Sequence, residues 1–380
     1  MLRRRQVSGG LAGAIVFLSA EALFATRGMS KEAEADGGDV AEILHRRVNV
    51  EKRSVGMASV RVTPNAVQVV CEGREGLSDR GKVSDETIFE IGSVTKIFTA
   101  LLLAGCALDG RLSVTDPVAK HLPGDFVLPE RDGRLITLAD LATHTAGFPR
   151  FPTMNSPSLQ DYSLSEFKTW LASFQLPRAP GAAWEYSNLG YALIGLALSY
   201  RAGRSYEQLL KDKLLGPLGL NDSLLYPPAN AAHLAEGHDG ALKPVPPAAL
   251  GIFAPAGSLR SSPRDMGRFM RALMPGSGSF VEPLNRSLLE IVRPAPPAGG
   301  KQALGWEILP AREGEFLSKD GVTAGQCASA VYDARTRRSF VVLSNTFPSF
   351  TGRSGSPSGG GIGAADVARR LLRPSIQLEA

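Results

Sequence analysis

The stretch IFEIGSVTKIFTALLLAGC, residues 88–106, decides the fold because strand-like residues, a glycine and an apolar helix follow one another directly. We expect the helix over residues 93–108, followed by Gly110 as a stop signal. A helix that is apolar almost all round must be central, so its first turn is expected to face any cleft. That turn carries Ser93 and Lys96 on one face. A buried lysine is costly unless it is paired or neutral, so this pair requires an explanation.

The Ser93–Lys96 pair has two interpretations. A serine at the start of a helix is by default an N-cap. Alternatively, desolvation lowers the pKa of Lys96, and its neutral amine accepts the proton of a nucleophilic Ser93 hydroxyl. The spacing S-x-x-K also occurs at Ser165 and Lys168, where the amphipathic pattern predicts a solvated helix face. The residues themselves leave Ser93 open between a cap and a nucleophile.

The composition is that of an ordinary globular protein. The chain has 380 residues, of which 43% are hydrophobic and 21% charged, so it could hold two domains or one domain with an insertion. The formal net charge of +5 is modest, and no Lys/Arg block alternates with aromatic residues. We therefore expect no nucleic-acid partner. The three cysteines, Cys71, Cys106 and Cys327, are expected to be structural thiols rather than one disulfide and a spare.

The N-terminus has the pattern of an export signal. Three arginines at residues 3–5 precede a short apolar run at residues 11–20, which is too short to span a bilayer. Small residues follow and offer cleavage sites after Ala22 or Ala25. We expect residues 1–25 to be a signal peptide that directs the chain to the periplasm. An uncleaved anchor, with inner-membrane association, and a mitochondrial transit peptide are the alternatives.

Strand-like alternation occurs near both ends of the chain, with helical spacing between them. Residues 55–73 and 326–346 each alternate like a pair of strands, whereas residues 124–247 carry helical spacing interrupted by Pro and Gly. This order predicts an α/β (α+β) fold, in which one antiparallel sheet is flanked by helices and an all-helical domain is inserted. The expected parts are a flexible N-terminus (26–38), a sheet-containing domain (39–123 and 248–373), a helical domain (124–247) and a tail (374–380).

Two further segments carry groups that a serine nucleophile requires. The phenol of Tyr186 could relay a proton and the amide of Asn188 could bind the substrate, although Asn188 could instead cap the next helix while Tyr186 packs. A basic residue is expected on an edge strand. Lys319 is the candidate because KDG leads into a hairpin, whereas the similar HDG at 238–240 is followed by prolines. Gly321 would let a substrate backbone approach the strand.

Together these motifs resemble those of the serine β-lactamase and penicillin-binding protein superfamily. The closer resemblance is to class C β-lactamases and to related D-alanyl-D-alanine carboxypeptidases and esterases. It rests on IGSVTK, LATHTAGFP, YSNLGYALIG, PAGSLRSSPRDMGRFM and KDGVTAG, and it runs from about residue 40 to residue 372. The resemblance implies a β-lactamase/transpeptidase-like fold. We expect no cofactor and no metal, because the two histidines of HLAEGH (233–238), which superficially resembles a metalloprotease helix, stand five residues apart and would lie on different faces. We expect a monomer.

The resemblance also implies a role for each residue. Ser93 would attack the substrate carbonyl and become acylated, with Lys96 as its base or co-base. Tyr186 would pass the proton between nucleophile, leaving group and water. Lys319 would hold the charge of the phenol and attract a substrate carboxylate. The backbone amides of Ser93 and Val322 would form the oxyanion hole.

Position 320 departs from the third motif of that superfamily, which usually reads K-T-G or H-T-G. A hydroxyl there can bind a substrate carboxylate, whereas an ionised Asp320 would repel it. This departure leaves room for cross-linked or uncharged substrates. The stretch THTAG (143–147) is implied to be a scaffold element. The implied substrate-binding residues are Asn188, Asp320, Gly321, Val322 and Thr323.

The sequence therefore predicts a periplasmic serine hydrolase that works through an acyl-enzyme. Its expected activity is that of a D-alanyl-D-alanine carboxypeptidase or endopeptidase on peptidoglycan, with penicillin binding. A class C-like β-lactamase or an esterase is the alternative within the same chemistry. A non-hydrolytic penicillin-binding sensor is the alternative of another class, and the presence of both Tyr186 and Lys319 favours turnover. The expected partners are peptidoglycan peptides or β-lactams.

Overall fold

The computed structural model describes residues 40–77, 80–153, 158–228, 231–312, 314–347 and 363–372. The predicted signal peptide, flexible N-terminus and C-terminal tail lie outside these ranges and stay predictions. Within the described ranges, no helix combines the length and the apolar composition needed to cross a membrane.

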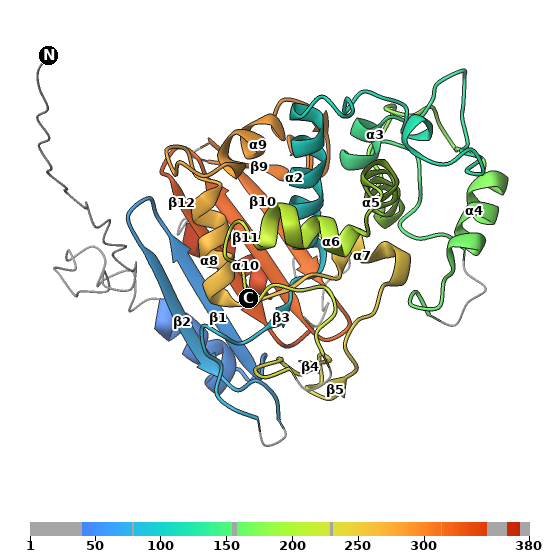
Figure 1. Cartoon of the computed structure of the whole chain (residues 1–380). Coiled ribbons are helices and arrows are strands. Elements are labelled where there is room, and N and C mark those ends of the chain that lie inside the picture. The colour runs from blue at the N-terminus through green and yellow to red at the C-terminus, as the bar shows by residue number, and fades with distance from the viewer. Residues whose placement is uncertain are drawn as a thin grey trace, which may run out of the picture.

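An eight-stranded antiparallel sheet forms the centre of the molecule (Figure 1). Its strand order is β2-β1-β12-β11-β10-β9-β8-β7, and each pair of neighbours is antiparallel. Two N-terminal strands join six strands from the C-terminal part of the chain through the β1–β12 pair. The predicted fold class and the sheet built from both chain ends are therefore confirmed. The strands are β1 (Gly56–Val62), β2 (Val67–Gly73), β7 (Arg293–Pro294), β8 (Lys301–Gln302), β9 (Glu307–Ala311), β10 (Gly314–Val322), β11 (Cys327–Asp333) and β12 (Arg338–Ser344).

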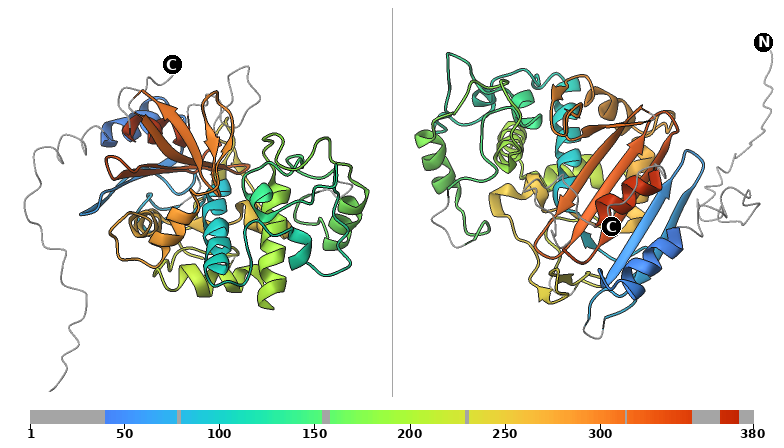
Figure 2. Two further views of the ribbon diagram at one scale, coloured as in Figure 1. Left: turned by 90° about the horizontal axis from the view of Figure 1, so that it is seen from above. Right: turned by 180° about the vertical axis from the view of Figure 1, so that it is seen from behind.

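Helices cover both faces of this sheet (Figure 2). On one face α8 (Pro263–Ala272) packs on β1, β2 and β12, and on the other α10 (Ala364–Leu372) packs on β11 and β12. Side chains alternate between the two cores along each strand, because successive residues of a strand point to opposite faces. In β11, Ala328 and Ala330 join the core on the α8 side, whereas Cys327 and Val331 join the core beneath α10.

The α2 helix (Thr95–Leu108) stands between the sheet and α5 (Asn188–Ala202), as Figure 1 shows. Every α2 residue from Thr95 to Ala104 is buried, as its apolar sequence predicts. A short 3₁₀ turn, η2 (Gly92–Val94), comes first, and the N-cap of α2 is Val94. The helix thus begins two residues later than predicted, and the interpretation of Ser93 as an N-cap is wrong. The Thr95 hydroxyl instead donates to the Gly92 carbonyl oxygen at 2.6 Å, which secures the tight turn.

The region predicted to be all-helical contains helices joined by long loops, and it is not wholly helical. It contains a small hairpin of β4 (Gly237–His238) and β5 (Pro244–Val245), which the proline-rich sequence had argued against. The domain boundaries at 124 and 247 stay predictions. Other elements are α3 (Leu138–Ala142), α4 (Leu164–Ser173), α6 (Tyr206–Leu210), α7 (Ala254–Gly257), α9 (Val281–Ser287), η1 (Arg46–Val50), η3 (Val118–His121), η4 (Lys211–Leu215), η5 (Gly251–Phe253), β3 (Phe89–Glu90) and β6 (Arg260–Ser261).

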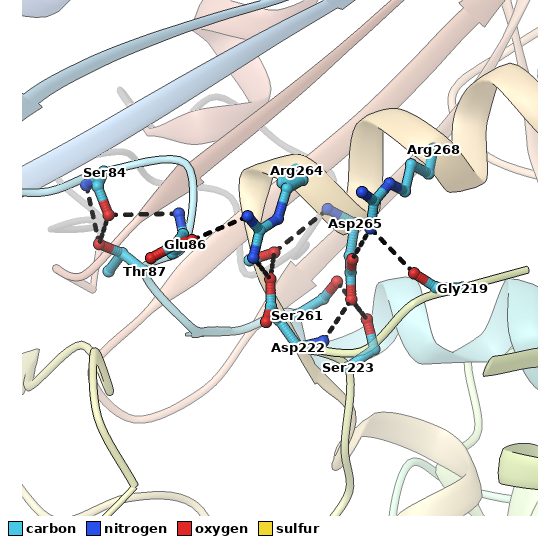
Figure 3. Close-up of polar contacts among 11 residues, drawn as sticks. Ser84, Glu86, Thr87, Gly219, Asp222, Ser223, Ser261, Arg264, Asp265 and Arg268 are labelled. Carbon is cyan, nitrogen blue, oxygen red and sulfur yellow. Dashed lines mark hydrogen bonds and ion pairs between the residues drawn. The ribbon is translucent and has the colours of Figure 1, made fainter. Parts of the chain in front are cut away.

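A polar network fastens the start of α8 to two loops (Figure 3). The buried Asp265 carboxylate accepts hydrogen bonds from the Asp222 amide at 2.8 Å and the Ser223 hydroxyl at 2.9 Å. Arg264 pairs with Asp222 at 3.0 Å and with Glu86 at 2.8 Å. A buried carboxylate must be satisfied in this way, and its partners fix the loops before η2 and after η4 against the sheet layer.

The three cysteines are free thiols, as predicted. Burial raises the pKa of the Cys71 thiol to about 12 and that of Cys327 to about 11. Burial also raises the pKa of Cys106. All three thiols therefore stay protonated at neutral pH and serve as small apolar groups.

Candidate active site

Three segments far apart in the sequence bring the four predicted catalytic side chains into one cluster. Ser93 lies in η2 and Lys96 in the first turn of α2. Tyr186 lies two residues before α5, and Lys319 lies on β10. The Tyr186 hydroxyl donates to Ser93 Oγ at 2.6 Å, and Lys96 Nζ donates to the same oxygen at 3.1 Å. Lys319 Nζ lies 5.2 Å from the centre of the Tyr186 ring. The Ser93 hydroxyl thus contacts a phenol and one amine, and a second amine lies beside the ring of that phenol.

Lys96 is arranged to act as a base. Its Nζ also donates to Asn188 Oδ1 at 2.8 Å and to the Ala256 carbonyl oxygen at 2.6 Å. These two oxygens only accept, so a neutral amine would keep its two hydrogens for them and turn its lone pair toward the Ser93 hydroxyl. Burial lowers the pKa of Lys96 to about 8, with the charge of Lys319 helping and that of Tyr186 opposing. The neutral form is therefore accessible close to neutral pH.

Tyr186 has a similar proton affinity. Burial alone would raise the pKa of its phenol, but the positive charges of Lys96 and Lys319 outweigh burial and lower the pKa to about 8. Two groups of nearly equal pKa exchange a proton at little cost. The Lys96–Tyr186 pair can therefore carry a proton between Ser93 and a leaving group.

Lys319 is buried and forms an ion pair that the sequence analysis missed. Its Nζ donates to Glu307 Oε1 on β9 at 2.9 Å. Burial alone would lower the pKa of Lys319, but the Glu307 carboxylate and the Tyr186 phenol together outweigh burial and raise this pKa above its ordinary value. Lys319 therefore stays an ammonium. A glutamate on a strand ordinarily suggests a solvated side chain, and only the β9–β10 pairing, which aligns Glu307 with Ser318, places it beside Lys319.

Two glycines let the turn that carries Ser93 lie directly against β10. A β-carbon on Gly321 would come within 2.0 Å of the Ile91 carbonyl oxygen and 2.8 Å of the Ser93 nitrogen. One on Gly92, which has a φ of +49°, would come within 2.6 Å of the Val322 nitrogen. The backbones of Ser93 and Val322, the implied oxyanion-hole residues, therefore lie close together, and only glycine permits this approach.

The prediction that Lys319 lies on an edge strand is wrong for the strand as a whole. β10 runs between β9 and β11 within the sheet. Its pairing with β9 stops at Ser318, however, while its pairing with β11 continues to Val322. The last four residues of β10 are therefore paired on one side, and the Ser93 turn approaches them where β9 has ended.

Asn188 lies in the cluster but does not cap its helix. The N-cap of α5 is Ser187, whose hydroxyl accepts a hydrogen bond from the Gly190 amide at 3.4 Å. Asn188 is buried, and its oxygen accepts the hydrogen bond from Lys96. The side-chain amide of Asn188 therefore positions the base, Lys96.

Asp320 and Thr323 lie apart from the cluster. Because β10 is pleated, Lys319 faces the α2 side of the sheet and Asp320 faces α10. Asp320 accepts a hydrogen bond from the Ser329 hydroxyl at 2.7 Å and pairs with Arg369 of α10. The Thr323 hydroxyl accepts from the Gln326 amide at 3.1 Å and closes the β10–β11 turn. The anionic charge of Asp320 is thus compensated on the far side of the sheet.

The histidine of THTAG packs behind the phenol. The His144 ring lies 4.5 Å from the Tyr186 ring between centres, and its Nδ1 accepts a hydrogen bond from the Ser187 amide at 3.2 Å. Burial, together with the charges of Lys319 and Lys96, keeps the pKa of His144 well below its ordinary value. A neutral ring in this place holds Tyr186 and the start of α5 in position, which agrees with a scaffold role.

The competing motifs lie elsewhere. Ser165 is exposed on α4 and Lys168 pairs with Asp125, so the second S-x-x-K has the predicted solvated face. The histidine of HDG, His238, is buried with its Nδ1 3.0 Å from the Asn345 carbonyl oxygen. In the described part of the chain, no three His, Cys, Asp or Glu side chains are grouped to hold a metal ion.

Comparisons with known proteins agree with this geometry. The Beta-lactamase family model matches residues 40–357. A beta-lactamase of Pseudomonas fluorescens is 27% identical over 72% of this chain and 75% of its own. The D-alanyl-D-alanine-carboxypeptidase/endopeptidase AmpH of Escherichia coli K12 is 29% identical over 62% of this chain and 60% of its own. The crystal structure of a beta-lactamase/D-alanine carboxypeptidase from Yersinia pestis shares the fold, with a TM-score of 0.71 and 23% identity over 81% of this chain and 92% of its own. The chain belongs to the beta-lactamase family of serine hydrolases.

Proposed function

We propose that the chain is a periplasmic hydrolase that forms an acyl-enzyme at Ser93 and cleaves D-alanyl-D-alanine peptides of peptidoglycan, as a carboxypeptidase or endopeptidase that also binds penicillins. The observation that carries this proposal is the double hydrogen bond to Ser93 Oγ, from Tyr186 at 2.6 Å and from Lys96 at 3.1 Å. The peptidase named among the relatives supports the choice of substrate. The periplasmic location is supported by the pattern of the N-terminal sequence.

The geometry supports a two-step reaction. In acylation, the neutral amine of Lys96 takes the hydroxyl proton as Ser93 Oγ attacks the carbonyl carbon, and the amides of Ser93 and Val322 stabilise the oxyanion. Tyr186 then protonates the leaving nitrogen as the C–N bond breaks, and it recovers a proton from Lys96. In deacylation, water gives its proton to the same pair and attacks the ester, which releases the acid and restores the Ser93 hydroxyl.

Lys319 assists both steps without moving a proton. Its ammonium, held by Glu307, lies near the Tyr186 ring and stabilises the phenolate that forms when Tyr186 gives up its proton. This role requires a permanent charge, which the raised pKa of Lys319 supplies.

A β-lactamase is the second candidate, because beta-lactamases stand among the relatives and the two reactions differ only in the leaving group. A substrate panel separates the candidates: nitrocefin, a peptide that ends in D-Ala-D-Ala, and a short-chain ester. We expect the highest kcat/KM on the peptide. A preference for nitrocefin would indicate a β-lactamase, and a preference for the ester would indicate an esterase. A lasting adduct in intact mass spectra without turnover of any substrate would indicate a sensor and contradict the proposal.

A further inference from the structure

Arg150 lies at the cluster without a part in the proton transfers. Its guanidinium carbon is 5.1 Å from the centre of the Tyr186 ring. Its backbone oxygen accepts a hydrogen bond from the backbone N–H of Asn188 at 3.0 Å. The backbone bond fixes Arg150 relative to the start of α5. A guanidinium that lies over an aromatic ring keeps its N–H groups as hydrogen-bond donors, so they stay available to a ligand.

The three cations around Tyr186 differ in whether a substrate can reach them. Lys96 and Lys319 are 0% and 1% exposed. Lys96 donates to the Asn188 and Ala256 oxygens, and the charge of Lys319 is compensated by the Glu307 carboxylate. Arg150 is exposed, and no carboxylate of the described residues pairs with it. Among the described residues, Arg150 is thus the cation at this cluster that can meet an incoming anion.

The usual source of carboxylate recognition is missing from the third motif. Asp320 occupies the position where the related motifs have a hydroxyl residue, and its side chain faces α10, where it pairs with Arg369. On the face of β10 that carries Lys319, position 320 therefore supplies no hydrogen-bond donor for a substrate carboxylate. A substrate carboxylate needs another donor, and a planar guanidinium matches a carboxylate with two parallel hydrogen bonds.

We propose that Arg150 is the specificity residue that binds the carboxylate at the leaving-group end of the substrate. This inference rests on the proposed function. The Tyr186 hydroxyl must reach the leaving nitrogen. In a terminal D-alanine, only the α-carbon separates that nitrogen from the carboxylate. The carboxylate then lies next to the ring that Arg150 covers. If Arg150 only packed on Tyr186, its removal would affect charged and uncharged substrates alike.

The test compares two D-alanyl peptides that differ only in a terminal carboxylate or carboxamide. Arg150→Gln should reduce the ratio of kcat/KM for carboxylate over carboxamide by about tenfold, the size of a charge-assisted hydrogen bond at a partly exposed site. Arg150→Lys should keep part of the preference, and Arg271→Gln, which removes an exposed arginine on α8, should keep all of it. An unchanged ratio, or an equal loss on both peptides, overturns the inference.

A binding measurement separates this inference from the proposed function. In a Ser93→Ala background, calorimetry should show that the carboxylate peptide binds more tightly than the carboxamide, and that Arg150→Gln removes the difference. Absence of turnover by the unmodified protein would contradict the proposed function and leave this binding test valid. Equal affinities for the two peptides, with Arg150 intact, would refute the role of Arg150.

Discussion

At the scale of single residues, Ser93 accepts hydrogen bonds from two groups whose pKa values both lie at about 8. Removal of one proton from the Lys96–Tyr186 pair creates a base next to Ser93, whichever of the two groups has lost it. The reactive form therefore accumulates as the pH rises through about 8. We expect kcat/KM to increase with pH below this value and to level off above it.

Tyr186→Phe tests the relay. We expect kcat on the peptide to fall by about 10²- to 10⁴-fold, the usual contribution of a proton-transferring group, with a smaller change in KM. The rising part of the pH profile should move to lower pH, because the charge of Tyr186 raises the pKa of Lys96 and would be absent. Tyr191→Phe is the matched control, since that buried phenol donates to the Ala142 carbonyl oxygen and not to Ser93. An unaltered rate, or a shift of the profile to higher pH, would contradict the relay.

At the scale of elements, the pleat of β10 decides which residues of the third motif can meet a substrate. The sequence-based interpretation treated Lys319, Asp320 and Gly321 as one continuous recognition motif. In the strand, Lys319 and Gly321 face the Ser93 turn, whereas Asp320 faces α10. The expectation that an ionised Asp320 repels a substrate therefore lacks its geometric basis.

Asp320→Thr should consequently fail to raise activity on carboxylate-bearing peptides, contrary to what the motif alone suggests. It should lower the free energy of unfolding by about 1–3 kcal/mol, because the half-buried Arg369 loses its partner. Denaturant unfolding measures the loss, and the double variant Asp320→Thr/Arg369→Met should recover part of it. A clear gain in kcat/KM on the carboxylate peptide would show that position 320 does face the substrate.

Local sequence patterns predict the end of α2 but not its start. Its buried length and its end at Leu108 follow from the apolar run and from Gly110, as expected. Its start does not, because a 3₁₀ turn stabilised by the Thr95 hydroxyl displaces Ser93 from the helix and presents its side chain to Tyr186. An apolar run indicates that a helix is buried, but it carries no information on how the first turn is wound.

At the scale of the whole molecule, the cluster could be predicted because each of its segments has a local signal. An apolar helix with Ser93 and Lys96, a loop with Tyr186 before a second helix, and a strand with Lys319 are each readable in the sequence. The contacts of Glu307 and Arg150 could not be predicted in this way. Glu307 depends on the register between β9 and β10, and Arg150 depends on the path of a loop, and neither has a periodic signature.

The central claim is that these separate segments make Ser93, and not another serine, a nucleophile. Intact mass spectrometry with peptide mapping, after incubation with a fluorescent penicillin, tests it most directly. We predict an adduct of one penicillin on the peptide that contains Ser93, its loss in Ser93→Ala, and its retention in Ser165→Ala, the matched control at the second S-x-x-K. An adduct that persists in Ser93→Ala, or that maps to another residue, would contradict the account.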